Sequence, residues 1–345
     1  MTRPGERDLQ VVLCGYYGFG NLGDELLARG LVELLEGCGI PRSRIGVLSA
    51  SPEVTAAELS VRAENRWSLR KVSGFLRSAS TLLLGGGGLF QDVTSIKSPV
   101  YYSGVVWLAR RAGAVPWAFG QSLGPLRTAL GRALAKRALG ACKVRVFRDR
   151  RSVAMAQSMG IGAAALAPDP VMALRPSVLR SKEEHLLVNV RPSKSFDLSK
   201  LARSIMRLAS ATGLSPVGFA MAQEDLIPLR DLETFGVRWS QVKLLRTLGD
   251  FEEMASRAGG SLSMRLHGVV LSALSGLPCG ALPYDPKVES FADAFGIPKH
   301  VGEGDIVLGK GVDPGVLEES AQALRDAMGT ALLKLKLKPD PVGGR

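Results

Sequence analysis

Short runs of Leu and Val alternate along the chain with longer segments in which apolar residues recur every three to four positions. The short runs are typical of buried strands, and the longer segments are typical of helices that cover a sheet, so the sequence predicts an α/β fold with parallel strands. In the first half, the predicted strands are residues 9–13, 44–48, 81–84, 115–119, 144–147 and 164–166. The predicted helices there are residues 24–35, 69–78, 99–111, 126–139 and 151–158.

A second series of strands is predicted at residues 186–190, 216–219, 241–244, 260–263 and 279–282. The segment 173–184 between the two series contains Pro176 and basic residues, which is typical of a linker. A length of 345 residues also fits two domains. We therefore expect two Rossmann-like domains that face a cleft, at residues 1–172 and 185–312, followed by a helix and basic tail at residues 313–345. A single large sheet is the alternative.

Composition narrows the function classes. The excess of 44 Lys and Arg over 32 Asp and Glu leaves a net charge of +12, which favours an anionic partner. Aromatic residues make up 6%, without basic runs interleaved with them, so we expect no nucleic-acid partner. The four cysteines form no CxxC pair, and the apolar stretch 266–282 is interrupted by glycine and proline. We expect a reduced, cytoplasmic protein.

The first predicted strand leads into a loop with the letters GYYGFGNLGDELL. Gly18, Gly20 and Gly23 match a dinucleotide-binding fingerprint, but the second strand ends without the acidic residue that would hold a ribose. Asp24 and Glu25 follow in the first helical turn. They either compensate the helix dipole or hydrogen-bond a hydroxylated acceptor.

Two further loops carry small and polar residues. Gly85 to Gly88 precede Gln91 and Asp92, but no Lys follows them as a phosphate-binding P-loop would require. The third loop contains GQSLG, which matches the letters of a hydrolase nucleophile elbow around Ser122. Three successive loops of this kind indicate a binding face, and a hydrolase stays a minor alternative. No metal-ligand spacing such as HExxH occurs, so we expect no metal site.

Cationic residues follow strands of the second half. Arg191 lies in NVRP, Arg265 and His267 in SMRLHG, and Lys287 in PYDPKV. Arg148 occupies the corresponding position in the first half. Arg offers a bidentate fork to carboxylate or phosphate, and Lys offers a compact charge. These residues predict a site for a small ligand that carries anionic groups, although a single Arg could equally form a structural salt bridge.

Taken together, the stretches GYYGFGNLGDELL, GGGGLFQD, GQSLGP, VFRDRRS, NVRP, MRLHG and YDPKV resemble the polysaccharide pyruvyl transferase family, in particular its CsaB-type members. The resemblance implies a glycosyltransferase-B-like fold of two domains. It implies transfer of the enolpyruvyl unit of phosphoenolpyruvate onto a sugar as a cyclic ketal, with no metal or redox cofactor. In CsaB-type members the sugar is an N-acetylmannosamine residue of a lipid-linked cell-wall precursor, and the pyruvylated polymer anchors surface-layer proteins.

The resemblance also assigns roles to residues. It implies that His267 and Arg265 are catalytic, and that phosphoenolpyruvate is bound by Arg148, Arg191, Arg265, His267 and Lys287. It implies that the acceptor is bound by Gly18, Asn21, Asp24, Glu25, Gln91 and Asp92. Family members commonly carry a serine where this chain has Cys14, so a ligand contact by that hydroxyl is in question here.

Two other functions share parts of this pattern. A nucleotide-sugar-dependent glycosyltransferase would have the same architecture, and a polysaccharide or lipid-head-group binding module would use the same basic residues. A lipid-linked acceptor further predicts peripheral contact with the inner face of the cell membrane. The C-terminal lysines Lys334, Lys336 and Lys338 are candidates for that contact, or they favour the C-terminal end of a helix that begins near Val316.

Overall fold

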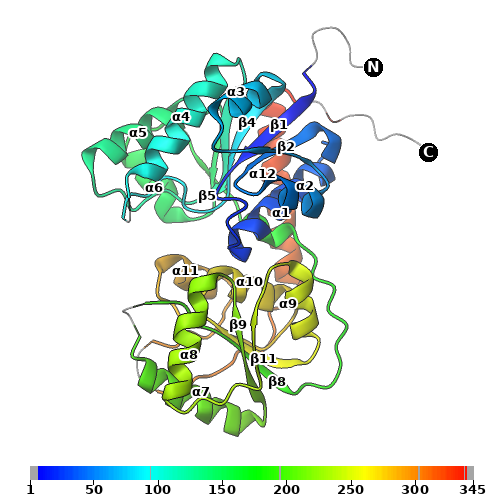
Figure 1. Cartoon of the computed structure of the whole chain (residues 1–345), viewed down its shortest axis with the longest axis vertical. Helices are drawn as coiled ribbons and strands as arrows, with labels where there is room; N and C mark the ends of the chain where they lie inside the picture. Colours follow the sequence, from blue (N-terminus) through cyan, green and yellow to red (C-terminus); the bar gives the residue numbers. More distant parts are fainter. Residues whose placement is uncertain (1–6, 94, 194–195, 302–303, 338, 340–345) are drawn as a thin grey trace, which may run out of the picture. The chain divides into compact units, whose positions relative to one another are not determined.

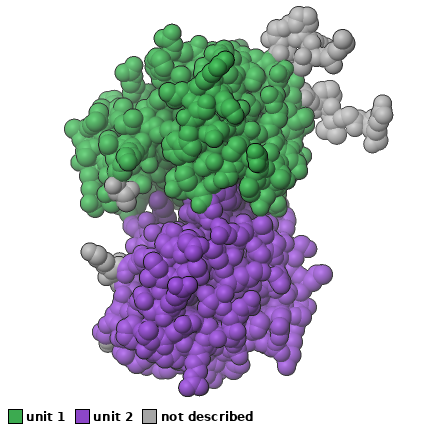
Figure 2. Space-filling view, in the orientation of Figure 1, with its two compact units in different colours: residues 1–19, 27–173, 320–345 green, residues 20–26, 174–319 purple. Residues whose placement is uncertain are grey.

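The computed structural model describes residues 7–93, 95–193, 196–301, 304–337 and 339. The chain divides into two compact units, each built around its own parallel sheet (Figure 1 and Figure 2). Unit 1 consists of residues 1–19, 27–173 and 320–345, and unit 2 consists of residues 20–26 and 174–319. The chain passes from unit 1 to unit 2 after residue 173, and residues 20–26 also group with unit 2, which the sequence did not indicate.

The sheet of unit 1 has the strand order β3-β2-β1-β4-β5-β6-β7, with every pairing parallel. The order reverses between β1 and β4, as in a doubly wound sheet, and ligands of such sheets bind beyond the strand ends at the reversal. The strands are β1 (Leu9–Cys14), β2 (Ile45–Ser49), β3 (Arg62–Asn65), β4 (Ala79–Gly85), β5 (Val115–Gln121), β6 (Arg145–Phe147) and β7 (Ala165–Leu166).

Helices cover both faces of this sheet (Figure 1). One layer consists of α3 (Leu69–Arg77), α4 (Lys97–Arg111), α5 (Ala129–Gly140) and α6 (Arg150–Ser158), whose apolar sides share one buried cluster with the strands. In α4, for example, Tyr102, Val105, Val106 and Ala109 recur at helical spacing and are buried. The other face carries α1 (Leu22–Gly37), α2 (Pro52–Leu59) and α12 (Pro314–Leu335).

The sheet of unit 2 repeats this plan with five parallel strands in the order β10-β9-β8-β11-β12. The order reverses between β8 and β11. The strands are β8 (His185–Asn189), β9 (Ser215–Ala220), β10 (Gln241–Leu244), β11 (Ala258–Ser263) and β12 (Cys279–Ala281). The helices are α7 (Leu198–Thr212), α8 (Leu226–Thr234), α9 (Leu248–Ala255), α10 (Leu266–Leu274) and α11 (Pro286–Ala294). Among the described residues, 3-10 turns lie at Arg42–Arg44 and Pro170–Ala173 in unit 1 and at Gln223–Asp225 in unit 2.

The prediction of an α/β fold with two parallel sheets is confirmed, and each predicted strand and helix overlaps an observed one. The sequence analysis had predicted neither β3 nor α2 in the first half, and it had given no bounds for α7 to α11 in the second half. Strand β3 has the sequence RAEN and pairs only along β2 at the edge of the sheet, so it lacks the apolar run of a central strand. Helix α2 has no marked apolar face and buries only Thr55 and Leu59. Among the described residues, no helix is long and apolar enough to cross a membrane.

Candidate active site

The strand-order reversal of unit 2 brings three of the residues predicted to bind phosphoenolpyruvate to neighbouring strand ends. Arg191 follows β8 by two residues, and Arg265 and His267 follow β11 by two and four residues. Strands β8 and β11 are hydrogen-bonded neighbours, with Asn189 opposite Ser263. Parallel pairing places both carboxyl ends at one edge of the sheet, so residues far apart in the sequence meet there.

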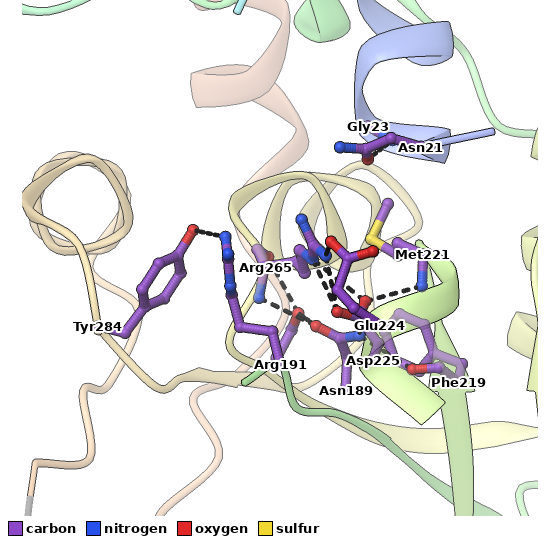
Figure 3. A network of polar contacts seen from close by, with 11 residues as sticks. Asn21, Gly23, Asn189, Arg191, Phe219, Met221, Glu224, Asp225, Arg265 and Tyr284 are labelled. Carbon is purple, nitrogen blue, oxygen red and sulfur yellow. Dashed lines mark hydrogen bonds and ion pairs between the residues drawn. The ribbon is translucent and has the colours of Figure 1, made fainter. Parts of the chain in front are cut away.

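Asn189 at the end of β8 ties three strand ends together (Figure 3). Its side-chain oxygen accepts the backbone N–H of Arg265 at 3.0 Å, and its nitrogen donates to the carbonyl of Phe219 in β9 at 2.9 Å. Asn189 is fully buried, so both polar ends of its amide need partners inside the protein. The amide fixes the backbone from which Arg265 extends.

The Arg265 guanidinium is held by two carboxylates from the turn after β9 (Figure 3). Its Nε donates to both oxygens of Asp225, at 3.2 and 3.1 Å, and its Nη2 donates to Asp225 and to Glu224, each at 2.7 Å. Burial alone would lower the pKa of Arg265, but the hydrogen bonds and charges of Asp225 and Glu224 raise it, so the side chain stays charged.

Asp225 and Glu224 differ in burial. Asp225 is fully buried and also accepts the backbone N–H of Met221 at 3.0 Å, which makes it a fixed anchor. The Glu224 side chain is 50% exposed. Burial alone would raise the pKa of Glu224, but the hydrogen bond and charge of Arg265, together with the charge of Arg191, lower it. The Glu224 carboxylate is therefore ionised at neutral pH, and it offsets part of the positive charge of Arg265 and Arg191.

Arg191 is oriented by an aromatic residue beyond β12. Its Nη1 donates to the hydroxyl of Tyr284 at 2.7 Å, and its guanidinium carbon lies 4.6 Å from the centre of the Tyr284 ring. The buried Nε of Arg191 has no hydrogen-bond partner among the described residues. The side chain thus carries a fixed orientation and an unused donor.

His267 lies in the first turn of α10, beside the first turn of α1. A Cβ added to Gly23 would lie 2.4 Å from the His267 Nδ1, so only glycine fits at that position. The backbone N–H of Leu22 donates to the carbonyl of Met221 at 2.8 Å, which attaches this turn to the end of β9. Residues 21–23 of the first loop therefore pack against residues 265–267 of the second half, within unit 2.

Lys287 lies in the first turn of α11, where its backbone N–H donates to the capping carboxylate of Asp285 at 2.9 Å. The residues predicted for the acceptor divide between the units. Asn21, Asp24 and Glu25 belong to unit 2, whereas Gly18, Gln91 and Asp92 belong to unit 1. The sequence prediction had assigned all six to the first domain, so the structure differs for the first three.

The unit 1 candidates have structural partners of their own. Asp92 is buried and accepts the N–H groups of Arg127 and Thr128, at 2.6 and 2.8 Å, and the hydroxyl of Thr128. The Thr128 hydroxyl is the largest influence that lowers the pKa of Asp92. Gly18 has φ of +80°, and its carbonyl accepts the Ser51 hydroxyl at 2.9 Å. Gln91 accepts the N–H of Val93 at 3.2 Å.

Arg148 lies in unit 1, in an ion pair with Asp169 at 2.6 Å, and both side chains are more than nine-tenths buried. Its Nε also donates to the Ser122 hydroxyl at 2.9 Å. That Ser122 hydroxyl is thereby engaged in the buried network that follows β5 and β6. Arg148 therefore forms a structural salt bridge, which is the alternative that the sequence analysis left open for any single Arg.

Sequence reasoning missed Asn189, Glu224, Asp225 and Tyr284. The letters QED after β9 carried a signal, because carboxylates at a strand end next to a predicted Arg cluster are natural ion-pair partners. It also missed an exposed group of rings in unit 1, which we call the aromatic patch and define as Tyr16, Phe19, Trp67 and Tyr101. Its aromatic residues come from separate segments, so no local pattern marks it.

The aromatic patch lies beyond the carboxyl ends of β1 and β3. Trp67 is 61% exposed and lies 6.1 Å from Phe19, centre to centre, with Phe19 stacked on Tyr16 at 4.0 Å. The buried guanidinium of Arg66 lies 4.4 Å from the Tyr101 ring centre and 5.1 Å from that of Phe19. Cation–π contacts of this kind hold the rings in place around one charge.

Cys14, at the end of β1, is fully buried. Burial raises the pKa of its thiol to about 11, although Arg66 and a hydrogen bond with Tyr101 act in the opposite direction. The thiol is therefore protonated at neutral pH and is enclosed by the protein. Among the described residues, no three His, Cys, Asp or Glu side chains lie close enough to hold a metal ion.

Comparisons with known proteins supply a family. The sequence model of the family described as "Polysaccharide pyruvyl transferase" matches residues 21–286. That range runs from the first turn of α1 to the start of α11, and so includes the whole constellation around Arg265. No match is found among curated proteins.

Solved structures share the fold at low sequence identity. A UDP-N-acetylglucosamine 2-epimerase is 12% identical, with a TM-score of 0.57 over 98% of this chain and 100% of its own. The UDP-GlcNAc 2-epimerase of Methanocaldococcus jannaschii is 11% identical, with a TM-score of 0.54 over 92% of each chain. Anabaena Alr3699/HepE in complex with UDP-glucose is 12% identical, with a TM-score of 0.56 over 94% of this chain and 92% of its own. The glycosyltransferase-B-like class of fold is thereby confirmed, and these likenesses extend to the fold alone.

Proposed function

Because the chain belongs to the polysaccharide pyruvyl transferase family, we propose that this enzyme moves the enolpyruvyl unit of phosphoenolpyruvate onto an N-acetylmannosamine-type sugar of a lipid-linked cell-wall precursor. The product is a cyclic ketal, and phosphate is released. The observation that carries the proposal is the cluster of Arg191, Arg265 and His267 at the strand-order reversal of unit 2. Membership of the family implies a phosphoenolpyruvate donor and a polysaccharide acceptor, and the particular sugar and the CsaB-type role in surface-layer anchoring are proposals.

The donor has two anionic groups, a carboxylate and a phosphate, and the site has cations suited to each. Arg191 presents a fixed guanidinium with an unused Nε donor, and Lys287 adds a compact charge from α11. The N-terminus of α10, capped by Arg265, adds backbone N–H groups and the positive end of a helix dipole. Glu224 occupies the exposed side of Arg265, so we propose that a donor oxygen displaces its carboxylate and takes over the hydrogen bond.

His267 is the proposed acid and base. A proton from an acid passes to the terminal CH₂ carbon of phosphoenolpyruvate, and the central carbon gains cationic character. One acceptor hydroxyl forms a C–O bond to that carbon, and its proton restores the acid. The bond between that carbon and the phosphate oxygen then breaks, and a second hydroxyl of the same sugar closes the ketal while its proton leaves with phosphate. An imidazole can both donate and accept a proton, so it is suited to both directions of transfer.

The acceptor is proposed to contact Asp24, Glu25 and Asn21 through its hydroxyl and amide groups. Gly18 and Gln91 contribute through their loops, and Asp92, whose carboxylate is taken up by Arg127 and Thr128, acts by holding its loop in shape. The aromatic patch suits a sugar ring, because the C–H face of a pyranose packs against the electron-rich face of an aromatic ring. Arg148 is proposed to position the loop after β5 rather than touch the donor.

A lipid-linked acceptor places the reaction at the cytoplasmic face of the cell membrane, and we propose that the protein is cytoplasmic with peripheral membrane contact. Of the C-terminal lysines named for this contact, Lys334 and Lys336 are exposed, and Lys338 lies outside the described residues. The reaction needs neither a metal ion nor a redox cofactor, and no nucleic acid is proposed as a partner.

The test is incubation with phosphoenolpyruvate and a lipid-like N-acetylmannosamine acceptor, with an assay of phosphate and mass analysis of the sugar. We expect phosphate release that depends on both substrates and a sugar heavier by one pyruvate in ketal linkage. Arg265→Ala and Lys287→Ala should each weaken phosphoenolpyruvate binding by about 1.5–3 kcal/mol. A nucleotide-sugar-dependent glycosyltransferase of the same fold is the second candidate, because HepE with the same fold was solved with UDP-glucose. Titration that shows binding of a UDP-sugar and none of phosphoenolpyruvate would establish that candidate instead.

A further inference from the structure

The charge of this chain is concentrated in one helical layer of unit 1. Residues 65–168 contain sixteen Lys and Arg but only two acidic residues, Asp92 and Asp149. The other 28 of the 44 basic residues are therefore matched by 30 of the 32 acidic residues. The segment carries a formal charge of +14 and the remainder −2, so the net charge of +12 originates here.

This segment forms α3, α4, α5 and α6 on one face of the first sheet, and we call these helices the basic layer. Of its sixteen cations, all but Arg66, Arg145 and Arg148 are exposed. Its two acidic residues are engaged within the layer, because Asp92 accepts N–H groups at the start of α5 and Asp149 caps α6 through Ser152. Two carboxylates that flank the segment pair with its cations, Glu64 with Lys71 and Asp169 with Arg148. The other exposed cations of the layer leave it strongly positive.

Exposed apolar side chains lie among these charges. On α4, Trp107 and Val100 are 51% and 50% exposed, and at the start of α5 Leu130 is 58% exposed. The chain has four tryptophans, and the two that are classed as exposed, Trp67 and Trp107, lie at or next to this layer. Exposed tryptophans beside Arg are typical of surfaces that contact the interfacial region of a membrane.

A groove of about 330 Å³ between helices α4 and α5 is lined by both cationic and apolar side chains. Trp107 and Arg110 line it from α4, and Leu134 and Arg137 line it from α5. The Ser103 hydroxyl donates to the carbonyl of Leu134 at 3.2 Å, which joins the helices along the groove, and Arg111 lies 5.0 Å from the centre of the Trp107 ring. In the described part of the chain, Arg110 and Arg137 form no ion pair with a carboxylate.

We propose that the outer surface of α4 and α5 docks onto an anionic lipid membrane, with Arg110 and Arg137 facing the headgroups and Trp107 and Val100 entering the interfacial region. Charge complementarity selects an anionic surface, and the apolar side chains between the arginines select a lipid surface over a polar polyanion. The proposal adds a membrane contact to the lipid-linked acceptor of the proposed function, but it rests only on the charges and exposure of this layer.

The test uses the full chain and flotation with vesicles of neutral phosphatidylcholine, with or without about one third anionic phosphatidylglycerol. We expect binding only to the anionic vesicles, and its loss at about 0.5 M salt, where the screening length is a few ångströms. The double variant Arg110→Glu/Arg137→Glu should lower binding at least about tenfold. Arg203→Glu/Arg230→Glu in unit 2 makes the same change in net charge at exposed arginines and should lower binding less than about twofold.

Further variants distinguish docking through α4 and α5 from unspecific attraction and from contact through the C-terminal tail. Trp107→Ala should lower vesicle binding several-fold, and unchanged vesicle binding would overturn the placement of Trp107 in the interfacial region. Equal losses in the two double variants would overturn the proposal in favour of unspecific attraction. Loss of binding in Lys334→Glu/Lys336→Glu, with retention in the α4–α5 variant, would assign the contact to the tail. Phosphate release with a soluble acceptor should be the same in all variants, so a failure of the proposed transfer would be seen separately from a failure to bind vesicles.

Discussion

The strand-order reversals of the two sheets have the same topology and opposite chemistry. In unit 2 the neighbouring strand ends carry Arg191, Arg265 and His267, with Asp225 and Glu224 beside them. In unit 1 the strand ends carry glycines, and the guanidinium of Arg66 is buried under the rings of the aromatic patch. Both sheets have a buried Arg–Asp pair at a strand end, Arg265 with Asp225 and Arg148 with Asp169.

The topology of a sheet therefore determines where a site lies, but the residues at the strand ends determine which ligand it binds. Charged groups that stay at the rim, such as the exposed side of Arg265, suit a small anion, because it can replace a carboxylate that already lies there. Rings with a buried charge beneath them suit a neutral, weakly polar ligand such as a sugar ring. The two buried Arg–Asp pairs provide the sharpest way to test this difference.

The largest expected effect is on stability, and it should be similar in the two units. Asp225→Ala leaves the Arg265 guanidinium without its buried partner, and Asp169→Ala does the same to Arg148. Each should lower the free energy of unfolding of its unit by about 3–5 kcal/mol, measured as the shift of that unit's transition in denaturant. Only Asp225→Ala should also weaken phosphoenolpyruvate binding, measured by calorimetry below the transition. Equal phosphoenolpyruvate affinity in both variants would remove the functional distinction between the pairs.

His267→Ala should lower kcat by about a hundredfold or more, the usual size of an acid–base contribution, while the fold is retained. The reason is its place in the first turn of α10, against the Gly23 turn. His185, at the start of β8, provides the control: His185→Gln should leave kcat unchanged, because it lies at the opposite end of that strand. Full turnover by His267→Gln would show that neither proton transfer nor a charged partner is supplied there.

The aromatic patch of unit 1 should act on the acceptor alone. Trp67→Ala removes one exposed stacking face, and since an aromatic contact contributes about 0.5–1.5 kcal/mol, KM for the acceptor should rise by about twofold to tenfold. The dissociation constant of phosphoenolpyruvate should not change. Trp107→Ala is the matched control with a soluble acceptor, because it also removes an exposed tryptophan that contacts an arginine. An unchanged KM in Trp67→Ala would leave the patch without a role in acceptor binding.

The fold could be predicted from the sequence because its central strands are apolar and are separated by segments with helical periodicity. Arg265 and His267 were readable because cations directly after a buried strand have few structural uses. Asp225 was missed although the letters QED carried a signal, because only the folding of β9 beside β8 brings it within 2.7 Å of Arg265. The grouping of Asn21, Asp24 and Glu25 with unit 2 was also beyond the sequence, because it depends on Leu22 bonding to Met221 about two hundred residues later.

Arg148 shows that a cation after a strand, which the sequence predicts to bind a ligand, can also form a structural salt bridge. Its place after β6 matched that of the arginines predicted to bind phosphoenolpyruvate, but Arg150 and Arg151 follow it, whereas an apolar helix follows Arg265. Its partner Asp169 follows β7 and forms the ion pair only when β7 pairs with β6. Residue type and position after a strand predict that a cation is held at the edge of a sheet. Arg148 and Arg265 each pair with a buried Asp, and Arg265 differs by its second partner, Glu224, whose side chain is half exposed.

Glu224 should give the smallest effect, because half of its side chain is exposed and ion pairs of this kind contribute about 0.2–1 kcal/mol. Glu224→Gln keeps the shape and removes the charge that competes with the donor for Arg265, so phosphoenolpyruvate should bind more tightly, by up to about fivefold. Since Arg265 lowers the pKa of Glu224, its carboxylate stays charged throughout the neutral range. The advantage of the variant should therefore be constant near neutrality. It should vanish only in acid, as the pH falls through that lowered pKa and the wild-type carboxyl becomes neutral. Calorimetric titrations of both proteins across this range measure the difference, and weaker binding by Glu224→Gln would mean that Glu224 orients Arg265 for the donor instead of competing with it.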